Sequence, residues 1–225
     1  MFDGRFRSQA EQRLRPIGRN LQRTGIRADH LTAFGVVMAL GGALAIGAGA
    51  LRLGLLLLIL TAVPDVLDGA VAKASGTASP RGAFFDSVSD RLTDALLLGG
   101  VAWYLATGHP GRIALLPMAV LALSMLISYE RAKAESLGFD AKGGLMERAE
   151  RLIALGLGLL FSNLLIGVLW IMCVLTAITA VQRFVKVWRQ ASVARPRRPA
   201  HRRRGRRSTS RVERSGRRRT PGSHT

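Results

Sequence analysis

The chain has 225 residues, a hydrophobic content of 48% and a net charge of +19. Its length corresponds to one domain, and its single cysteine, Cys173, excludes an internal disulfide. The charge is uneven, because residues 195–219 carry thirteen Arg and one Glu, a net of +12, which leaves +7 (19 − 12) for the rest. Long apolar runs beside a basic end indicate a membrane protein.

Residues 1–30 are polar and Arg-rich, and they contain no apolar stretch of the kind found in a cleavable signal peptide. A mitochondrial-type presequence is the alternative, but the acidic residues within this segment argue against it. We predict an amphipathic helix lying in the membrane interface. Its lipid-facing residues would be Phe2, Phe6, Leu14, Ile17 and Leu21.

The middle of the chain, residues 31–190, contains six mostly apolar stretches separated by turn signals. A bilayer span needs about 20 such residues. We therefore predict an all-α integral membrane domain with six transmembrane helices, plus the interfacial helix before it. The expected spans are 31–51, 53–74, 82–106, 113–137, 145–161 and 164–187.

The two ends of the chain are the most basic regions, and basic loops favour the cytoplasmic side. An even number of spans would place both ends there, in a multi-pass protein of the cell membrane. Residues 191–225 are rich in Arg, Pro and Ser, which predicts a disordered tail. We expect the tail to bind anionic membrane lipids, and we expect no main function in nucleic-acid binding because no folded basic domain accompanies it.

Acidic residues concentrate between the second and third expected spans: five of the eight Asp lie within residues 64–94. Asp65 and Asp68 are three residues apart, and Asp86 and Asp90 are four apart, so each pair shares one helix face. A carboxylate at mid-bilayer costs about 2.5–3.5 kcal/mol. Four facing carboxylates repel each other unless a cation joins them, and oxygen ligands favour Mg²⁺, Mn²⁺ or Ca²⁺. The pattern thus predicts a divalent metal site on the cytoplasmic side.

Two other interpretations of these acids remain open. The carboxylates can form a structural salt-bridge network with Lys73, Arg81 and Arg91. They can also mark an ion or proton pathway, which would make the chain a transporter.

The same residues resemble the signature of the CDP-alcohol phosphotransferases, which reads D-x2-D-G-x2-A-R-x8-G-x3-D-x3-D. Seven of the eight fixed positions match, and Lys73 replaces the usual Arg. The resemblance implies a membrane enzyme that transfers a phosphatidyl group from CDP-diacylglycerol to an alcohol and releases CMP. It also implies a homodimer.

The resemblance assigns roles to individual residues as well. It implies that Mg²⁺ or Mn²⁺ is held by Asp65, Asp68, Asp86 and Asp90, with Asp90 also acting as general base. Asp94 would pair with Arg91 or with an Arg of the fifth span. Asp29 stands where the family has a conserved stretch before span one, although it equally suits a helix N-cap. The CDP-lipid would contact Asp29, Gly69, Lys73 and Gly82.

The stretch 127–152 is similar to the corresponding part of actinobacterial phosphatidylinositol phosphate synthases, with Arg131 and Ala149 as departures. The resemblance implies a phosphorylated polyol as acceptor, with inositol phosphate preferred and glycerol 3-phosphate as the alternative. Simpler interpretations are membrane anchoring by Arg131 and local pairing of Arg148 and Arg151 with Glu147 and Glu150. The residues expected to bind the acceptor phosphate are Ser128, Arg131, Arg151 and Arg183.

Overall fold

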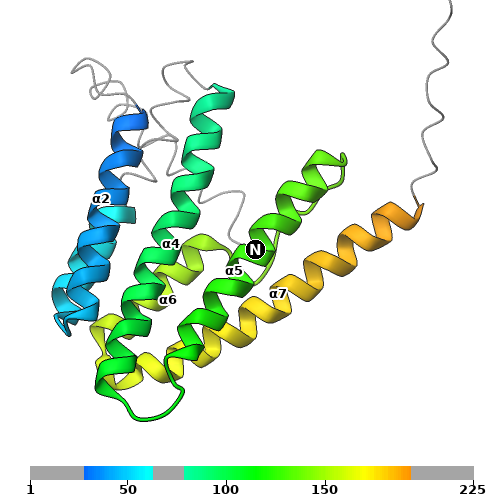
Figure 1. The fold of residues 1–225 in the computed structure, drawn as a ribbon. Helices are drawn as coiled ribbons and strands as arrows, with labels where there is room; N and C mark the ends of the chain where they lie inside the picture. Colours follow the sequence, from blue (N-terminus) through cyan, green and yellow to red (C-terminus); the bar gives the residue numbers. More distant parts are fainter. Residues whose placement is uncertain (1–27, 63–78, 194–225) are drawn as a thin grey trace, which may run out of the picture. The chain divides into compact units, whose positions relative to one another are not determined.

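The computed structural model describes residues 28–62 and 79–193, and within these ranges all regular secondary structure is helical (Figure 1). A short 3-10 helix, η1, precedes the last α-helix. The helices are α2 (Ala28–Gly47), Leu51–Ala62, α4 (Pro80–Gly108), α5 (Leu115–Ser136), α6 (Arg148–Leu160), η1 (Ser162–Leu164) and α7 (Leu165–Val193).

Each expected span has an α-helix at its place in the described part of the chain, so the all-α prediction is confirmed. Among the described residues, three helical stretches are long and apolar enough to cross a membrane: Asp29–Gly47, Leu115–Ser136 and Ser162–Val193. This confirms the membrane character of the chain. The count of six spans stays a prediction, because the 13 residues of α6 rise only about 20 Å against a hydrocarbon core of about 30 Å.

Two helix boundaries differ from the prediction in a way that bears on the site. The fifth helix begins at Arg148 and not at 145, because Leu145 and Met146 donate their backbone N–H groups to Thr179. The last helix continues to Val193, past the predicted end at 187, and so takes in the first residues of the predicted tail. On these added turns, the Gln190 side chain binds the backbone of Asp140 in the chain between α5 and α6, which stabilises the helix beyond the apolar run.

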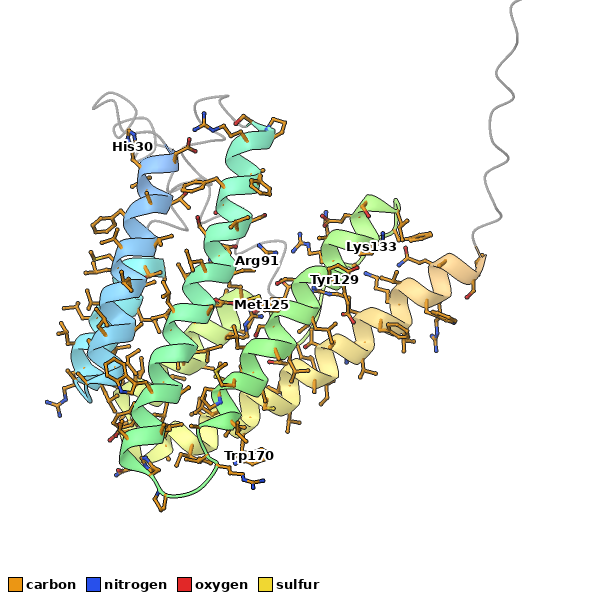
Figure 2. All side chains as sticks on the ribbon, viewed as in Figure 1. His30, Arg91, Met125, Tyr129, Lys133 and Trp170 are labelled. Atoms are coloured by element: carbon orange, nitrogen blue, oxygen red, sulfur yellow. The ribbon has the colours of Figure 1, made fainter. Side chains whose placement is uncertain are left out.

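The helices pack in the order α2 against α4, α4 against α5, and α5 against α7, while α6 packs against α7. The backbones of α2 and α4 approach closely, since a Cβ on Gly100 would lie 2.6 Å from the Ala43 carbonyl oxygen. Ile46, Leu97 and Leu105 are among the fully buried side chains of the hydrophobic core. Large apolar residues such as Trp170 are exposed on the outer faces, as in helices that meet lipid (Figure 2).

Several predictions lie outside the described residues. These are the interfacial helix, as far as residue 27, and the tail from residue 194. The predicted metal-binding and CDP-lipid-binding residues of the second span also lie outside them: Asp65, Asp68, Gly69 and Lys73.

Candidate active site

The acidic side of α4 carries Asp86, Asp90 and Asp94 at intervals of four residues, so the three carboxylates lie along one helix face. The helix begins at Pro80, and the Ser79 hydroxyl caps it by accepting a 3.1 Å hydrogen bond from the Gly82 N–H. Burial increases inward: Asp86 and Asp90 are partly buried, whereas Asp94 is buried. The innermost carboxylate, Asp94, is therefore the least exposed of the three.

Arg148, the first residue of α6, binds the middle of this acidic face. Its Nη1 lies 3.0 Å from Asp90 Oδ1, its Nη2 donates to the Thr93 hydroxyl at 3.0 Å, and its Nε lies 3.6 Å from Asp94 Oδ1. The Thr93 hydroxyl in turn donates to the Asp90 carbonyl at 2.9 Å. Arg91 is the more distant partner of Asp90, at 3.9 Å. One guanidinium thus holds the carboxylates of two successive α4 turns.

Arg151 binds the innermost carboxylate. Its Nη2 donates to Asp94 Oδ2 at 2.7 Å, and its Nη1 donates to the Met146 carbonyl at 3.3 Å. Both side chains are buried. The expectation that Asp94 pairs with an Arg of the fifth helix is confirmed, and the local pairing of Arg151 with Glu147 or Glu150 is wrong.

Arg183, on α7, is buried like Arg151. Its Nη1 donates to the Ile127 carbonyl of α5 at 2.9 Å, and its Nη2 donates to the Gly143 carbonyl at 3.0 Å. The same Nη2 lies 3.5 Å from Glu147. Arg131 and Arg151 are both near enough to act electrostatically on Arg183. The fold therefore brings together three arginines predicted to bind the acceptor phosphate, from α5, α6 and α7.

The other two residues predicted to bind the acceptor phosphate, Ser128 and Arg131, lie on α5. Ser128 is partly buried and follows Ile127, whose carbonyl Arg183 binds. Arg131 is partly exposed and donates to Glu135 at 3.0 Å. Arg131 is consequently the most solvent-accessible of the three arginines, while Arg151 and Arg183 are mainly committed to protein groups.

The starts of α2 and α4 also meet. A Cβ on Gly82 would lie 3.4 Å from Ser79 Oγ and 3.8 Å from Asp29 Oδ1. Asp29 is in the first turn of α2, one residue inside the helix, so the N-cap interpretation is wrong; there the carboxylate still interacts favourably with the helix dipole. Of the predicted CDP-lipid residues, Asp29 and Gly82 are therefore neighbours, and Gly69 and Lys73 lie outside the described residues.

The metal prediction involves two described residues, Asp86 and Asp90. Within the part of the chain that the structure describes, no three His, Cys, Asp or Glu side chains are grouped as a metal site would require. Asp65 and Asp68, the other two predicted ligands, fall in the 63–78 range that is not described.

Sequence reasoning missed several neutral polar groups next to Asp90. A small cavity there is lined by Thr32, Gly35, Thr61, Ser89, Asp90, Thr93 and Arg148. The four hydroxyl residues are buried. The sequence held one signal for them: Ser89 and Thr93 are four residues apart and each lies one residue before a carboxylate of the acidic motif, Asp90 or Asp94. Arg148 was missed as the partner of Asp90 because the two are far apart in sequence.

Comparisons with known proteins agree with this architecture. The sequence profile of the family described as CDP-alcohol phosphatidyltransferase matches residues 26–188. The chain is 33% identical to the phosphatidylinositol phosphate synthase of Mycobacterium marinum over 183 residues, which cover 77% of this chain and 78% of that protein.

Two crystal structures of the phosphatidylinositol phosphate synthase of Mycobacterium tuberculosis have the same fold. One has CDP-DAG bound, with a TM-score of 0.74, 32% identity and coverage of 82% of this chain and 98% of that chain. The other is a complex with manganese and citrate, also with a TM-score of 0.74 and 32% identity, covering 81% and 92%. The acidic motif, the helical membrane fold and the profile match lead to one conclusion: the chain belongs to the CDP-alcohol phosphatidyltransferase family.

Proposed function

We propose that this enzyme transfers the phosphatidyl group of CDP-diacylglycerol to a hydroxyl of inositol phosphate and releases CMP. The acceptor oxygen attacks the phosphorus that carries diacylglycerol, the pyrophosphate P–O bond breaks, and the hydroxyl proton passes to a base. The observation that carries the proposal is the contact of the acidic α4 face with two arginines of α6: Arg148 lies 3.0 Å from Asp90, and Arg151 lies 2.7 Å from Asp94. The names of the M. marinum and M. tuberculosis relatives support inositol phosphate as acceptor.

We assign the base to Asp90. Arg148 and Thr93 fix the position of this residue, the first through its carboxylate and the second through its carbonyl. A base must lie within hydrogen-bond reach of the proton it takes, so an oriented carboxylate at the junction of α4 and α6 suits the role.

Asp65, Asp68, Asp86 and Asp90 are the residues we assign to Mg²⁺ or Mn²⁺. The donor set fits hard cations, because it consists of carboxylate oxygens alone, and Asp86 forms no hydrogen bond or ion pair with the other described residues. When bound, such ions neutralise the charge that develops on the departing CMP phosphate. The manganese complex of the M. tuberculosis relative supports the choice of metal.

For the CDP-lipid we assign Asp29, Gly69, Lys73 and Gly82. The adjacency of Asp29 and Gly82 supports this, because a residue without a side chain leaves room beside the α2 carboxylate. A larger side chain at position 82 would fill that room.

For the acceptor phosphate we assign Ser128, Arg131, Arg151 and Arg183. Guanidinium groups bind phosphate oxygens through paired donors. Since Arg151 and Arg183 are held mainly by Asp94 and by backbone carbonyls, Arg131 would provide the most accessible direct contact. Glycerol 3-phosphate carries the same anionic group and is the second acceptor to be tested.

We further propose that all six helices cross the membrane, with both termini and the active site on the cytoplasmic side. The basic ends of the chain support this orientation. The interfacial segment would occupy 1–30, the catalytic domain would begin at 31, and the tail would bind anionic lipids. We also propose that the enzyme forms a homodimer. Membership of an enzyme family makes the transporter alternative unnecessary.

The proposal is tested with the full chain in vesicles that contain CDP-diacylglycerol. CMP release should require both a divalent metal and inositol phosphate, and mass spectrometry should find phosphatidylinositol phosphate. A product formed only with glycerol 3-phosphate would correct the acceptor. Release of CMP with neither acceptor, or ion flux without CMP, would contradict the proposed reaction.

A further inference from the structure

A row of four polar side chains follows one face of α7 near its C-terminal end. The residues of this α7 polar stripe are Thr179, Arg183, Lys186 and Gln190, spaced four, three and four apart. All four bind the connection between α5 and α6, residues 137–147. The helix was predicted from its apolar residues, and these four polar residues played no part in that prediction.

The connection runs antiparallel to the stripe. Gln190 binds Asp140, Lys186 binds Asp140 and Lys142, Arg183 binds Gly143, and Thr179 accepts from the N–H groups of Leu145 and Met146 at 3.1 Å each. Contacts thus proceed backward along α7 as they proceed forward along the connection. This order fixes the register of the connection on the helix.

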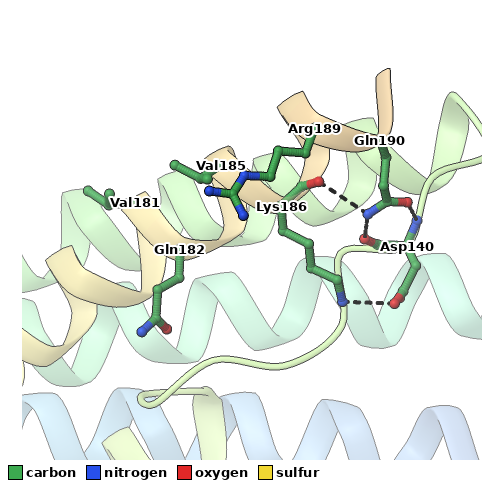
Figure 3. Close-up of a pocket in the computed structure, with 7 residues that line it drawn as sticks. All are labelled: Asp140, Val181, Gln182, Val185, Lys186, Arg189 and Gln190. Atoms are coloured by element: carbon green, nitrogen blue, oxygen red, sulfur yellow. Dashed lines mark hydrogen bonds and ion pairs between the residues drawn. The ribbon is translucent and has the colours of Figure 1, made fainter. Parts of the chain in front are cut away.

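The outer end of the stripe forms a clamp on Asp140 (Figure 3). The Gln190 side-chain amide engages both backbone groups of Asp140: Nε2 donates to the carbonyl at 2.7 Å, and Oε1 accepts from the N–H at 3.0 Å. Lys186 Nζ donates to Asp140 Oδ2 at 2.8 Å and to the Lys142 carbonyl at 2.8 Å. The clamp therefore holds the main chain as well as one carboxylate.

The connection leads directly to the active-site arginines. It ends at Glu147, which is followed by Arg148, the partner of Asp90 and Thr93. One turn later, Arg151 binds Asp94. A shift of the connection along α7 would move the start of α6, and both guanidinium groups would move with it relative to the α4 carboxylates.

We infer that Lys186 and Gln190 are positioning residues for the acceptor side of the reaction. By clamping residues 140–142 onto α7, they set where the start of α6 stands opposite Asp90 and Asp94. The inference rests on the proposed function, because it concerns the acceptor of that reaction. It adds two residues that would touch neither substrate nor metal.

Because the clamp is exposed, its effect should depend on several contacts acting together on one segment. The Lys186–Asp140 pair is well exposed to solvent, and a single exposed ion pair contributes little. The bidentate amide contact and the Lys142 carbonyl contact add to it on the same short segment. Removing one member should therefore have a smaller effect than removing both.

The test uses the full chain in lipid nanodiscs and the variants Lys186→Met, Gln190→Ala and the double substitution. We measure KM for inositol phosphate, KM for CDP-diacylglycerol, and amide hydrogen exchange in residues 138–147. The double variant should exchange faster there and raise the acceptor KM about tenfold, since displacement of distant supports misplaces reacting groups. The KM for CDP-diacylglycerol should change by less than about twofold. Asp29 and Gly82, the described residues assigned to the CDP-lipid, lie on α2 and α4 and not on the connection.

Matched controls come from the same helix. Gln182 and Arg189 line a surface hollow together with Asp140, Lys186 and Gln190, but they make no hydrogen bond with the connection, so the controls are Gln182→Ala and Arg189→Met. Both should behave as the wild type does. Lys186→Arg keeps a cationic donor and should restore most of the acceptor KM. Where the double variant fails to assemble, Gln190→Glu replaces it, because the carboxylate keeps an acceptor and loses the donor to the Asp140 carbonyl.

The inference is overturned if exchange accelerates without a change in the acceptor KM, or if both KM values rise equally. It is also overturned if exchange does not change. Failure of the proposed function looks different, because it appears in the wild type: inositol phosphate is not used. If the wild type uses glycerol 3-phosphate, the same variant-to-wild-type ratios are measured with that acceptor. A wild type inactive with both acceptors would overturn both proposals.

Discussion

Arg151 donates a 2.7 Å hydrogen bond to the Asp94 carboxylate, and the two side chains are only 7% and 8% exposed. This buried ion pair joins α6 to α4 at the inner end of the acidic face. Removing Arg151 would leave the buried Asp94 carboxylate with only the longer 3.6 Å contact from Arg148, in a region of low dielectric constant.

Arg151→Met should therefore lower the free energy of unfolding by about 3–5 kcal/mol. Thermal unfolding of the purified protein in detergent measures the effect. The double variant Asp94→Leu/Arg151→Met removes both charges and should recover much of the loss. A double variant as unstable as the two single variants added together would show that the pair is not coupled.

Asp90→Asn should reduce kcat by about 10²–10⁴-fold, the range expected for loss of a general base. The amide oxygen can still accept from Arg148, so CDP-diacylglycerol binding should change little. CMP release under saturating substrate measures kcat, and a binding titration measures the lipid. Glu150→Gln, an exposed change on α6, is the control. Near-normal turnover of Asp90→Asn would mean that another residue is the base.

Gly100→Ala should destabilise the protein, because the new Cβ would lie 2.6 Å from the Ala43 carbonyl oxygen and force α2 away from α4. Overpacking of this kind costs about 1–3 kcal/mol. The neighbouring Gly99→Ala is the matched control, because a Cβ there meets nothing within 4 Å. It should be neutral or stabilising, since Ala favours a helix over Gly. Equal melting temperatures for the two variants would contradict this close approach.

The contacts of Asp140 should depend on pH. The hydrogen bond from Lys186, together with the one from the Lys142 N–H, lowers the pKa of the Asp140 carboxyl below its ordinary value of 3.8. A lowered pKa in the folded state stabilises the clamp above the ordinary pKa, and this contribution is lost as the pH falls through the folded value. Protection of residues 138–147 from exchange, relative to an unstructured peptide of the same sequence at each pH, should therefore fall below about pH 4.

Asp140→Asn removes the titrating group, so its protection in this segment should lack that acid-dependent step. The rest of the clamp remains, because Gln190 binds only the backbone of residue 140. The same acid loss in the Asn variant would assign the titration to another group.

The sequence by itself determined the helical membrane fold and the acidic motif, because both depend on local spacing. An apolar run of span length and an i,i+4 pair of carboxylates on α4 have the same meaning wherever the helix packs. The expected pairing of Asp94 with an arginine of the fifth span also followed from its place on that face. Even the short glycine-rich contacts between the first helices were consistent with close packing.

Only the tertiary structure decided which arginine binds which acid. Local spacing suggested Glu147 and Glu150 as partners, yet Arg151 pairs with Asp94, and Glu147 pairs with Arg183. Burial explains the outcome, because an ion pair is stronger where water is excluded. The clamp of Lys186 and Gln190 on Asp140 was invisible for a related reason. Its partners are more than forty residues apart, and only the path of the connection along α7 brings them into contact.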